Sequence, residues 1–257
     1  MSAAALALHQ FRFDQKVFWR NPASVFFTVM LPLIFLFIFA TIFGNETIEE
    51  RGGVKTTTYY VPAIISLAVI SATTQSLAIN LTQDRERGLL KRVRGTPLPT
   101  PFFVAGRVGN ALVVSVLMVI LVSVIGRLVY DVSLPGGTTS PAVLVTLAVG
   151  AFAFSCLGFA LTAIIPSEDA AAPVANATIL PLYFISGVVI PDSEIPSGVL
   201  QVADVFPVRH FFEAFFAAWD PNTTGSGFEF GDLAVVAAWG VFGLLVALRF
   251  FRWEPRR

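Results

Sequence analysis

The chain has 257 residues, of which 55% are hydrophobic and only 13% carry a charged side chain, and its 17 basic and 17 acidic residues leave a net charge of zero. Soluble domains have about 25% charged residues, so this composition excludes an ordinary soluble globule, and it also excludes a polar disordered chain and a nucleic-acid-binding protein. The one cysteine, Cys156, excludes an intrachain disulfide framework. A membrane protein with several spans remains.

The first predicted element is a helix over Leu6–Arg20 that lies on the membrane surface. At 100° per residue, one face of about 80° collects the basic side chains and another collects apolar ones, a pattern typical of interfacial helices. The basic face consists of His9, Arg12, Lys16 and Arg20. A plain cytoplasmic extension is the alternative. Pro22 is expected to end this helix.

Six windows without Asp, Glu, Lys or Arg follow in the chain. They are Ala23–Phe43, Tyr60–Leu81, Val108–Gly126, Ala142–Ile165, Ala170–Ile190 and Leu233–Leu248. A bilayer core of about 30 Å needs about 20 apolar residues in a helix. We therefore predict transmembrane helices over about residues 23–43, 60–81, 103–126, 142–165, 170–190 and 233–250. The polar residues of the second window are expected to face other helices, where they can form hydrogen bonds.

The basic residues predict the orientation of these spans. Thirteen of the 17 fall before the first span, between the second and third, or after the last. Because basic residues concentrate on the cytoplasmic side, both termini are predicted to be cytoplasmic, which agrees with an even number of spans.

The most charged stretch is the cytoplasmic segment Asp84–Pro97, DRERGLLKRVRGTP. Its acids, Asp84 and Glu86, come first, and its last basic residues suit the dipole of a short helix that Gly95 and Pro97 would close. Such a helix can dock another protein. A solvated loop whose arginines only set the topology is an equal alternative on physical grounds.

The longest outer connection, Pro191–Gly231, contains the apolar run VRHFFEAFFAAW over Val208–Trp219. A structureless loop of this length is uncommon, so we predict short helices that dip into the outer leaflet, with an amphipathic surface helix as the alternative. His210 and Glu213, three residues apart, would share a helix face as an exposed ion pair or, less favoured, as an acid/base pair.

No catalytic constellation is found in the sequence. His9 and His210 are predicted on opposite sides of the membrane, and no HExxH, GxSxG or Walker loop occurs. The six windows contain no ionisable coupling residue of the kind that ion-driven carriers use, although carbonyls and hydroxyls alone can hold Na⁺. We therefore predict no catalytic residue and no metal site, and an energy source on another polypeptide.

Three stretches together resemble a known family. They are QKVFWRNP (Gln15–Pro22), DRERGLLKRVRGTPL (Asp84–Leu98) and LPLYFISGVVIPDSEIPSGVLQVADVFPVRHFFEA (Leu180–Ala214). In this order they resemble the ABC-2 type permeases, the membrane subunits of ATP-driven exporters that include daunorubicin-resistance-type drug exporters. The resemblance covers nearly the whole chain.

The resemblance implies an all-α fold in one transmembrane domain, residues 1–257, with an outer re-entrant hairpin between spans five and six. It implies a homodimer in a bacterial cell membrane, with two copies of a separate ABC ATPase subunit that binds ATP and Mg, and no cofactor on this chain. The coupling residues would be Asp84, Glu86, Arg87, Gly88, Leu89, Lys91 and Arg92. The interfacial helix would present Arg12, Lys16, Trp19 and Arg20, and the hairpin bend would contain Ser186, Gly187 and Pro191.

The function expected from these observations is export of an amphipathic or hydrophobic substrate, such as a drug or a lipid-like molecule. Export of a polysaccharide or glycolipid is the alternative, and an ion-coupled secondary carrier ranks below it. An intramembrane enzyme lacks a candidate polar cluster. Gly88→Pro and Glu86→Arg are predicted to leave membrane insertion intact and to uncouple transport from ATP hydrolysis.

Overall fold

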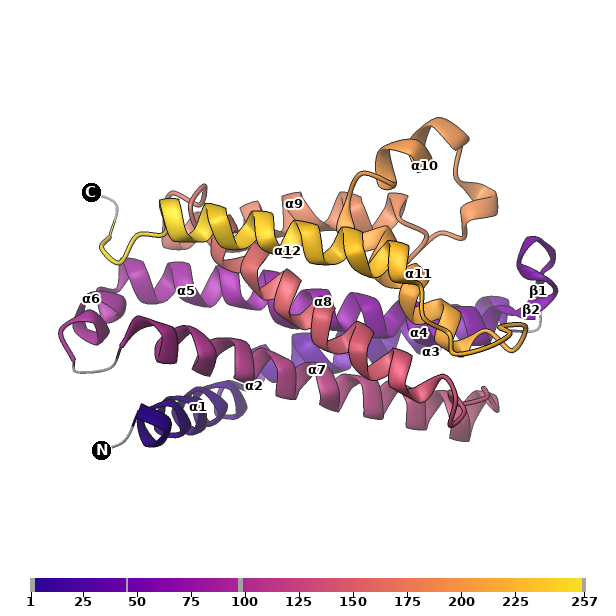
Figure 1. Cartoon of the computed structure of the whole chain (residues 1–257), viewed down its shortest axis with the longest axis horizontal. Coiled ribbons are helices and arrows are strands. Elements are labelled where there is room, and N and C mark those ends of the chain that lie inside the picture. Colours follow the sequence, from indigo (N-terminus) through magenta and orange to yellow (C-terminus); the bar gives the residue numbers. More distant parts are fainter. Residues whose placement is uncertain (1–2, 45, 97–98, 256–257) are drawn as a thin grey trace.

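The computed structural model describes residues 3–44, 46–96 and 99–255, which form an elongated helical bundle (Figure 1). Its α-helices are α1 (Ala3–Trp19), α2 (Pro22–Val25), α3 (Leu31–Phe43), α4 (Thr56–Ile70), α5 (Ser76–Glu86), α6 (Leu89–Arg94), α7 (Thr100–Tyr130), α8 (Ser140–Leu161), α9 (Glu168–Ile185), α10 (Ser197–Ala203), α11 (Pro207–Trp219) and α12 (Phe230–Phe250). The π-helical turns are η1 (Phe26–Met30) and η3 (Ser71–Gln75), and the 3-10 turns are η2 (Glu49–Arg51) and η4 (Asp192–Glu194). Strands β1 (Thr47–Ile48) and β2 (Val54–Lys55) pair antiparallel, with Thr47 opposite Lys55.

The centre of the bundle is the continuous rod α4–η3–α5. Every residue of α4 is buried, as expected for a helix that is apolar on all sides. Three polar residues of this rod are buried, and their hydroxyls form hydrogen bonds: Ser66 donates to the Pro62 carbonyl and Thr73 to the Val69 carbonyl of the rod itself, and Thr74 donates to the Phe154 carbonyl of α8. For these residues, the prediction that they face other helices is confirmed.

Helices α8 and α12 pack closely because small residues line their contact. A Cβ atom placed on Gly240 would lie 2.8 Å from the Cβ of Ala153, so a larger residue there would push the two helices apart. Close approach of this kind is the usual way in which helices associate in membranes.

Within the described residues, four helices are long and apolar enough to cross a membrane: Thr56–Glu86, Thr100–Tyr130, Ser140–Leu161 and Phe230–Phe250. They correspond to the second, third, fourth and sixth predicted spans. The first predicted span contains a shorter apolar helix, Thr28–Phe43, and the fifth corresponds to the 18-residue helix α9. The all-α membrane class therefore holds, whereas the count of six spans stays a prediction.

Two predicted spans extend past the helices that they describe. The fourth was drawn to Ile165, but α8 ends at Leu161, and the fifth was drawn to Ile190, but α9 ends at Ile185. The absence of charge continues into the turns beyond both helices, so it does not mark the helix end. Gly187, whose φ of 80° is left-handed, does mark such an end.

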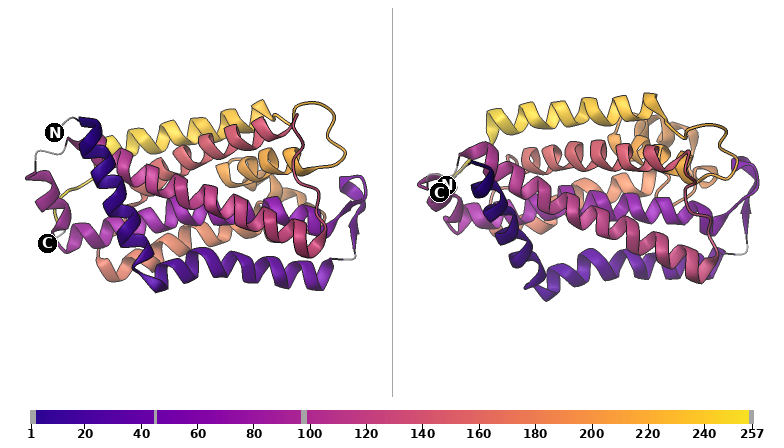
Figure 2. Two further views of the ribbon diagram at one scale, coloured as in Figure 1. Left: turned by 90° about the horizontal axis from the view of Figure 1, so that it is seen from below. Right: turned by 60° about the horizontal axis from the view of Figure 1, so that its bottom comes forward.

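The two ends of the bundle differ in what they contain. One end, here the termini end, holds α6, the start of α1 and the end of α12, and the other, the hairpin end, holds β1, β2 and α10 (Figure 1). Helix α1 runs obliquely across the bundle over α7 (Figure 2). It ends at Trp19, and the break at Arg20–Asn21 directly before Pro22 is the one predicted, with Pro22 itself as the first residue of α2.

The outer connection between α9 and α12 forms short helices, α10 and α11. Phe211, Phe212 and Phe215 of α11 are fully buried, and α11 packs against α4, α8 and α12. The short helices are confirmed, but the expectation that their phenylalanines insert into the outer leaflet is wrong, and entry of this segment into the membrane stays a prediction. These phenylalanines face the protein core and not the lipid.

Candidate functional site

The predicted coupling segment is not one helix but two. Asp84, Arg85 and Glu86 complete α5, and α6 begins only at Leu89. Gly88 separates them with a φ of 72°, a left-handed conformation that favours glycine. The expectation of a single short helix is thus wrong in its first half, while its end at Gly95 is correct, since the Gly95 amide donates to the Lys91 and Arg92 carbonyls. Pro97 and Leu98 lie outside the described residues.

Arg85 fixes the end of α5 to the end of α8. Its side chain is buried, and its guanidinium donates to the Thr162 and Ile165 carbonyls at 2.9 and 2.8 Å. The third contact is an ion pair with Glu86 at 2.6 Å. A cation at a helix C-terminus satisfies carbonyls that have no partner within the helix. Arg85 was not predicted as a site residue, although it lies within the charged segment.

Arg107 of α7 connects the coupling segment to the interfacial helix. Its guanidinium forms an ion pair with Asp84 and lies 3.6 Å from a carboxylate oxygen of Asp14 in α1. Asp14 is buried and accepts hydrogen bonds from the Gln10 amide at 3.1 Å. Burial raises the pKa of the Asp14 carboxyl more than the charge of Arg107 lowers it. Neither Arg107 nor Asp14 was predicted as a site residue.

Arg87 extends this network to α9. Its exposed guanidinium forms an ion pair with Glu168, in the first turn of α9, where an acidic residue also suits the helix dipole. The last residues of α5 and the turn after it thus contact α7, α8 and α9 through side chains.

Helix α6 presents the remaining predicted coupling residues away from the bundle. Leu90 is buried and holds α6 against the protein, whereas Leu89 is 41% exposed. Lys91, Arg92 and Arg94 are exposed, and no ion pair within the described part of the chain involves them. The structure therefore divides the predicted set into residues that hold the segment in place and residues that a partner can reach.

The interfacial helix α1 has the predicted two faces. Its basic residues and Trp19 are exposed, and Asp14 and Phe18 are buried on the opposite face. The indole of Trp19 donates to Gln15 at 3.0 Å. This arrangement agrees with the predicted basic face, whose position at a membrane surface stays a prediction.

The predicted hairpin bend lies at the C-terminus of α9. Ser186 caps this helix, Gly187 turns the chain, and Pro191 precedes η4. The Tyr59 hydroxyl donates to the Gly187 carbonyl, which ties the bend to the central rod.

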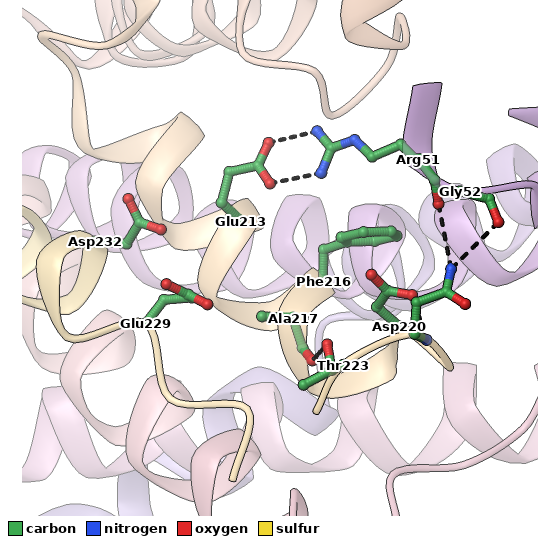
Figure 3. Close-up of a pocket in the computed structure, with 10 residues that line it drawn as sticks. Arg51, Gly52, Glu213, Phe216, Ala217, Asp220, Thr223, Glu229 and Asp232 are labelled. Atoms are coloured by element: carbon green, nitrogen blue, oxygen red, sulfur yellow. Dashed lines mark hydrogen bonds and ion pairs between the residues drawn. The ribbon is translucent and has the colours of Figure 1, made fainter. Parts of the chain in front are cut away.

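At this end, two arginines and two acids join the strand segment to η4 and α11. Arg51 donates to both carboxylate oxygens of Glu213 at 2.7 Å and to Asp192 at 2.8 Å, and Arg209 donates to Asp192 at 2.8 and 3.0 Å. Figure 3 shows the paired contacts of Arg51 and Glu213. The predicted His210–Glu213 pair is wrong, because Glu213 binds Arg51 while His210 contacts Asp232 at 2.6 Å.

A cavity of about 620 Å³ lies beside this cluster. Arg51 and Phe216 form one part of its wall, and Glu229 and Asp232 lie across from them (Figure 3). Phe216 stacks under the Arg51 guanidinium at 4.8 Å. Among the described residues, no group of His, Cys, Asp and Glu is arranged to hold a metal ion.

A sequence model of the ABC-2 type transporter family matches residues 9–218. The chain is 23% identical over 232 residues to the transport permease YvfS of Bacillus subtilis (strain 168), covering 90% of this chain and 91% of that protein. It is 22% identical over 209 residues to the daunorubicin resistance ABC transporter permease protein DrrB1 of Streptomyces coeruleorubidus, covering 81% of this chain and 72% of that protein.

Proposed function

Because the chain belongs to the ABC-2 type transporter family, we propose that it is the membrane subunit of an ABC exporter for an amphipathic or hydrophobic substrate. A separate ATPase subunit binds ATP and Mg and docks on α6. Two copies of each subunit form the complex, and the termini end lies in the cytoplasm of a bacterial cell.

The observation that best supports this proposal is the division of the coupling segment. Leu89, Lys91 and Arg92 form an exposed basic and apolar surface on a short helix. The end of α5, from which the turn at Gly88 leads into that helix, is held by Arg85 at α8 and by Arg107 of α7. A force applied to α6 is therefore transmitted to several helices at once. A loop that only sets topology would not need these buried contacts.

The substrate class is inferred from the helices and from the relatives. The predicted spans offer apolar faces and hydroxyls that already bond to backbone carbonyls, which suits a substrate with a large hydrocarbon part. The relative DrrB1 is named for daunorubicin resistance. Export of a polysaccharide or glycolipid is the competing outcome.

Docking is tested by charge reversal on α6. In Lys91→Glu/Arg92→Glu, we expect the copurifying ABC ATPase of the source organism to be lost, because the cationic surface becomes anionic. The matched control, Lys55→Glu/Arg127→Glu, reverses one Lys and one Arg that are exposed at the opposite end and is expected to retain it. Glu86→Arg is a poorer probe, since it removes the partner of the buried Arg85.

Transport is tested with proteoliposomes that contain both subunits. We expect ATP-dependent movement of daunorubicin or a fluorescent phospholipid, and none of a fluorescent dextran. Equal transport of the dextran would favour the polysaccharide alternative. Transport by the chain alone, without ATPase and ATP, would support an ion-coupled carrier and contradict the proposal.

A further inference from the structure

A second cavity, of about 230 Å³, lies between α8, α9 and α12. Its wall comes from α8, α9 and α12, and the chain immediately before and at the start of α11, Phe206–Val208, closes one side. Drug-sized ligands occupy pockets of about 300–1,000 Å³. This cavity is too small for a multi-ring molecule but has room for a narrow chain.

The wall of this cavity has no free hydrogen-bond donor. Its three polar side chains are Thr74, Thr178 and Trp239, and each donates to a backbone carbonyl: to Phe154 at 2.9 Å, to Val174 at 2.8 Å and to Val205 at 2.8 Å, respectively. A polar group placed there would lose its bonds to water and gain none from these donors. The wall therefore suits a ligand made only of hydrocarbon.

The cavity extends along α8 over most of the thickness of one leaflet's hydrocarbon and includes an exposed wall residue. Its wall residues Phe154 and Leu161 are seven residues apart on α8, about 11 Å, and half of a bilayer core is about 15 Å. Ile164, which also lines it, is 62% exposed. The cavity thus extends along α8 toward the termini end and opens where Ile164 lies.

An exposed arginine lies between this cavity and the termini end of α12. Arg249 is ten residues beyond Trp239 on α12, about 15 Å along the helix axis toward the termini end. It is exposed, its guanidinium stacks on Phe250 at 5.7 Å, and no ion pair within the described part of the chain involves it. An arginine at this depth attracts a phosphate.

We propose that this cavity holds one acyl chain of a phospholipid from the leaflet at the termini end, with Arg249 facing its phosphate. The acyl chain fills the space between α8, α9 and α12 and contacts the start of α11. This binding needs no ATPase and no ATP, so it stands or fails independently of the proposed export function.

Quenching of Trp239 fluorescence tests the proposal in vesicles of phosphatidylcholine and phosphatidylglycerol whose acyl chains are brominated. The contribution of Trp239 is the difference between the unaltered chain and Trp239→Phe. We expect Ala160→Phe, which fills the cavity, to lose most of this quenching. Leu144→Phe places the same aromatic side chain at a 67% exposed position on α8 outside the cavity and is expected to keep it.

Ala160→Leu fills the cavity partly and serves if Ala160→Phe does not yield folded protein; it is expected to lose part of the quenching. Equal quenching in the Ala160 and Leu144 variants would mean that Trp239 touches only bulk lipid and would overturn the proposal. We expect Arg249→Gln to abolish any preference for phosphatidylglycerol. A brominated alkyl maltoside that quenches as efficiently as the phospholipids at equal mole fraction would overturn the assignment of the phosphate.

Discussion

The termini end and the hairpin end both depend on arginines but use them differently. At the hairpin end, Arg51 and Arg209 bind carboxylates, with Asp192 shared between them. At the termini end, Arg85 binds backbone carbonyls of the α8 terminus, and Arg107 joins two acids from different helices. The cations of α6 form no ion pair within the described part of the chain.

This difference separates closure from docking. The two hairpin arginines are neutralised within the chain, and the cavity beside them has additional acids such as Asp220 and Glu229. The termini end instead presents Lys91 and Arg92 on a helix that follows the anchored end of α5. We infer that the hairpin end is held together by its own charges, whereas the termini end keeps charge available for a partner.

The largest expected loss of stability follows from the removal of Arg85. Arg85→Ala removes the donor to the Thr162 and Ile165 carbonyls and the ion pair with Glu86. We expect a loss of about 3–5 kcal/mol in the free energy of unfolding, measured by denaturation in detergent. Arg94→Ala, an exposed control on α6, should change it by less than about 0.5 kcal/mol. A similar small change for Arg85→Ala would contradict its anchoring role.

The counterpart at the hairpin end is Arg51. Arg51→Gln removes the paired contacts with Glu213 and the contact with Asp192, and we expect a loss of about 1.5–3 kcal/mol because the bonds involve charged groups. ATPase binding should not change, since α6 lies at the other end. Loss of ATPase binding in this variant would remove the distinction between the two ends.

Gly88 tests the turn between α5 and α6. Gly88→Ala meets no atom within 4 Å of its Cβ, so only the left-handed backbone is penalised, by about 1–2 kcal/mol. We expect less transport per ATP hydrolysed and no loss of insertion, with a stronger effect in Gly88→Pro, whose ring forbids this φ. Asparagine tolerates the conformation, so Gly88→Asn should retain more transport than Gly88→Ala. The reverse order would reject a role for the turn geometry.

The smallest expected effect concerns Asp14. Because burial raises the pKa of its carboxyl in the folded chain, the folded state binds this proton more tightly than the unfolded state. The contribution of Asp14 to stability is therefore most favourable below its unfolded pKa of 3.8 and declines as the pH rises through the folded pKa. Asp14→Asn should slightly stabilise the protein at neutral pH and not at low pH, as followed by thermal unfolding. Destabilisation at neutral pH would mean that attraction to Arg107 dominates.

The sequence predicts this fold well where a property is local. Apolar windows identify the long helices, the basic arc of α1 follows from its spacing, and the bend at Gly187 follows the end of α9. Glycine weakens a helix, but the order of acidic residues first and basic residues last across the whole charged segment favours one helix without a break at Gly88. The two-helix arrangement follows because α5 continues the second span.

The long-range contacts could not be predicted. Arg85 binds carbonyls 77 and 80 residues away, and every residue has a carbonyl, so no side chain identifies these partners. His210 pairs with Asp232, 22 residues away, and not with the nearby Glu213, because Arg51 from a different loop takes Glu213. In the sequence, Arg107 cannot be distinguished from a cation that only sets the topology, because nothing local indicates that α1 lies across α7.

The labelling rate of a cysteine in place of Leu89 tests most directly whether the ABC ATPase subunit docks on α6. The native Cys156 is buried, so a maleimide should react mainly with the introduced thiol. We expect labelling of Leu89→Cys to slow strongly when the ABC ATPase subunit is bound, while labelling of Arg127→Cys at the hairpin end stays the same. An unchanged rate at position 89 in a complex that still hydrolyses ATP and transports substrate would contradict docking on α6.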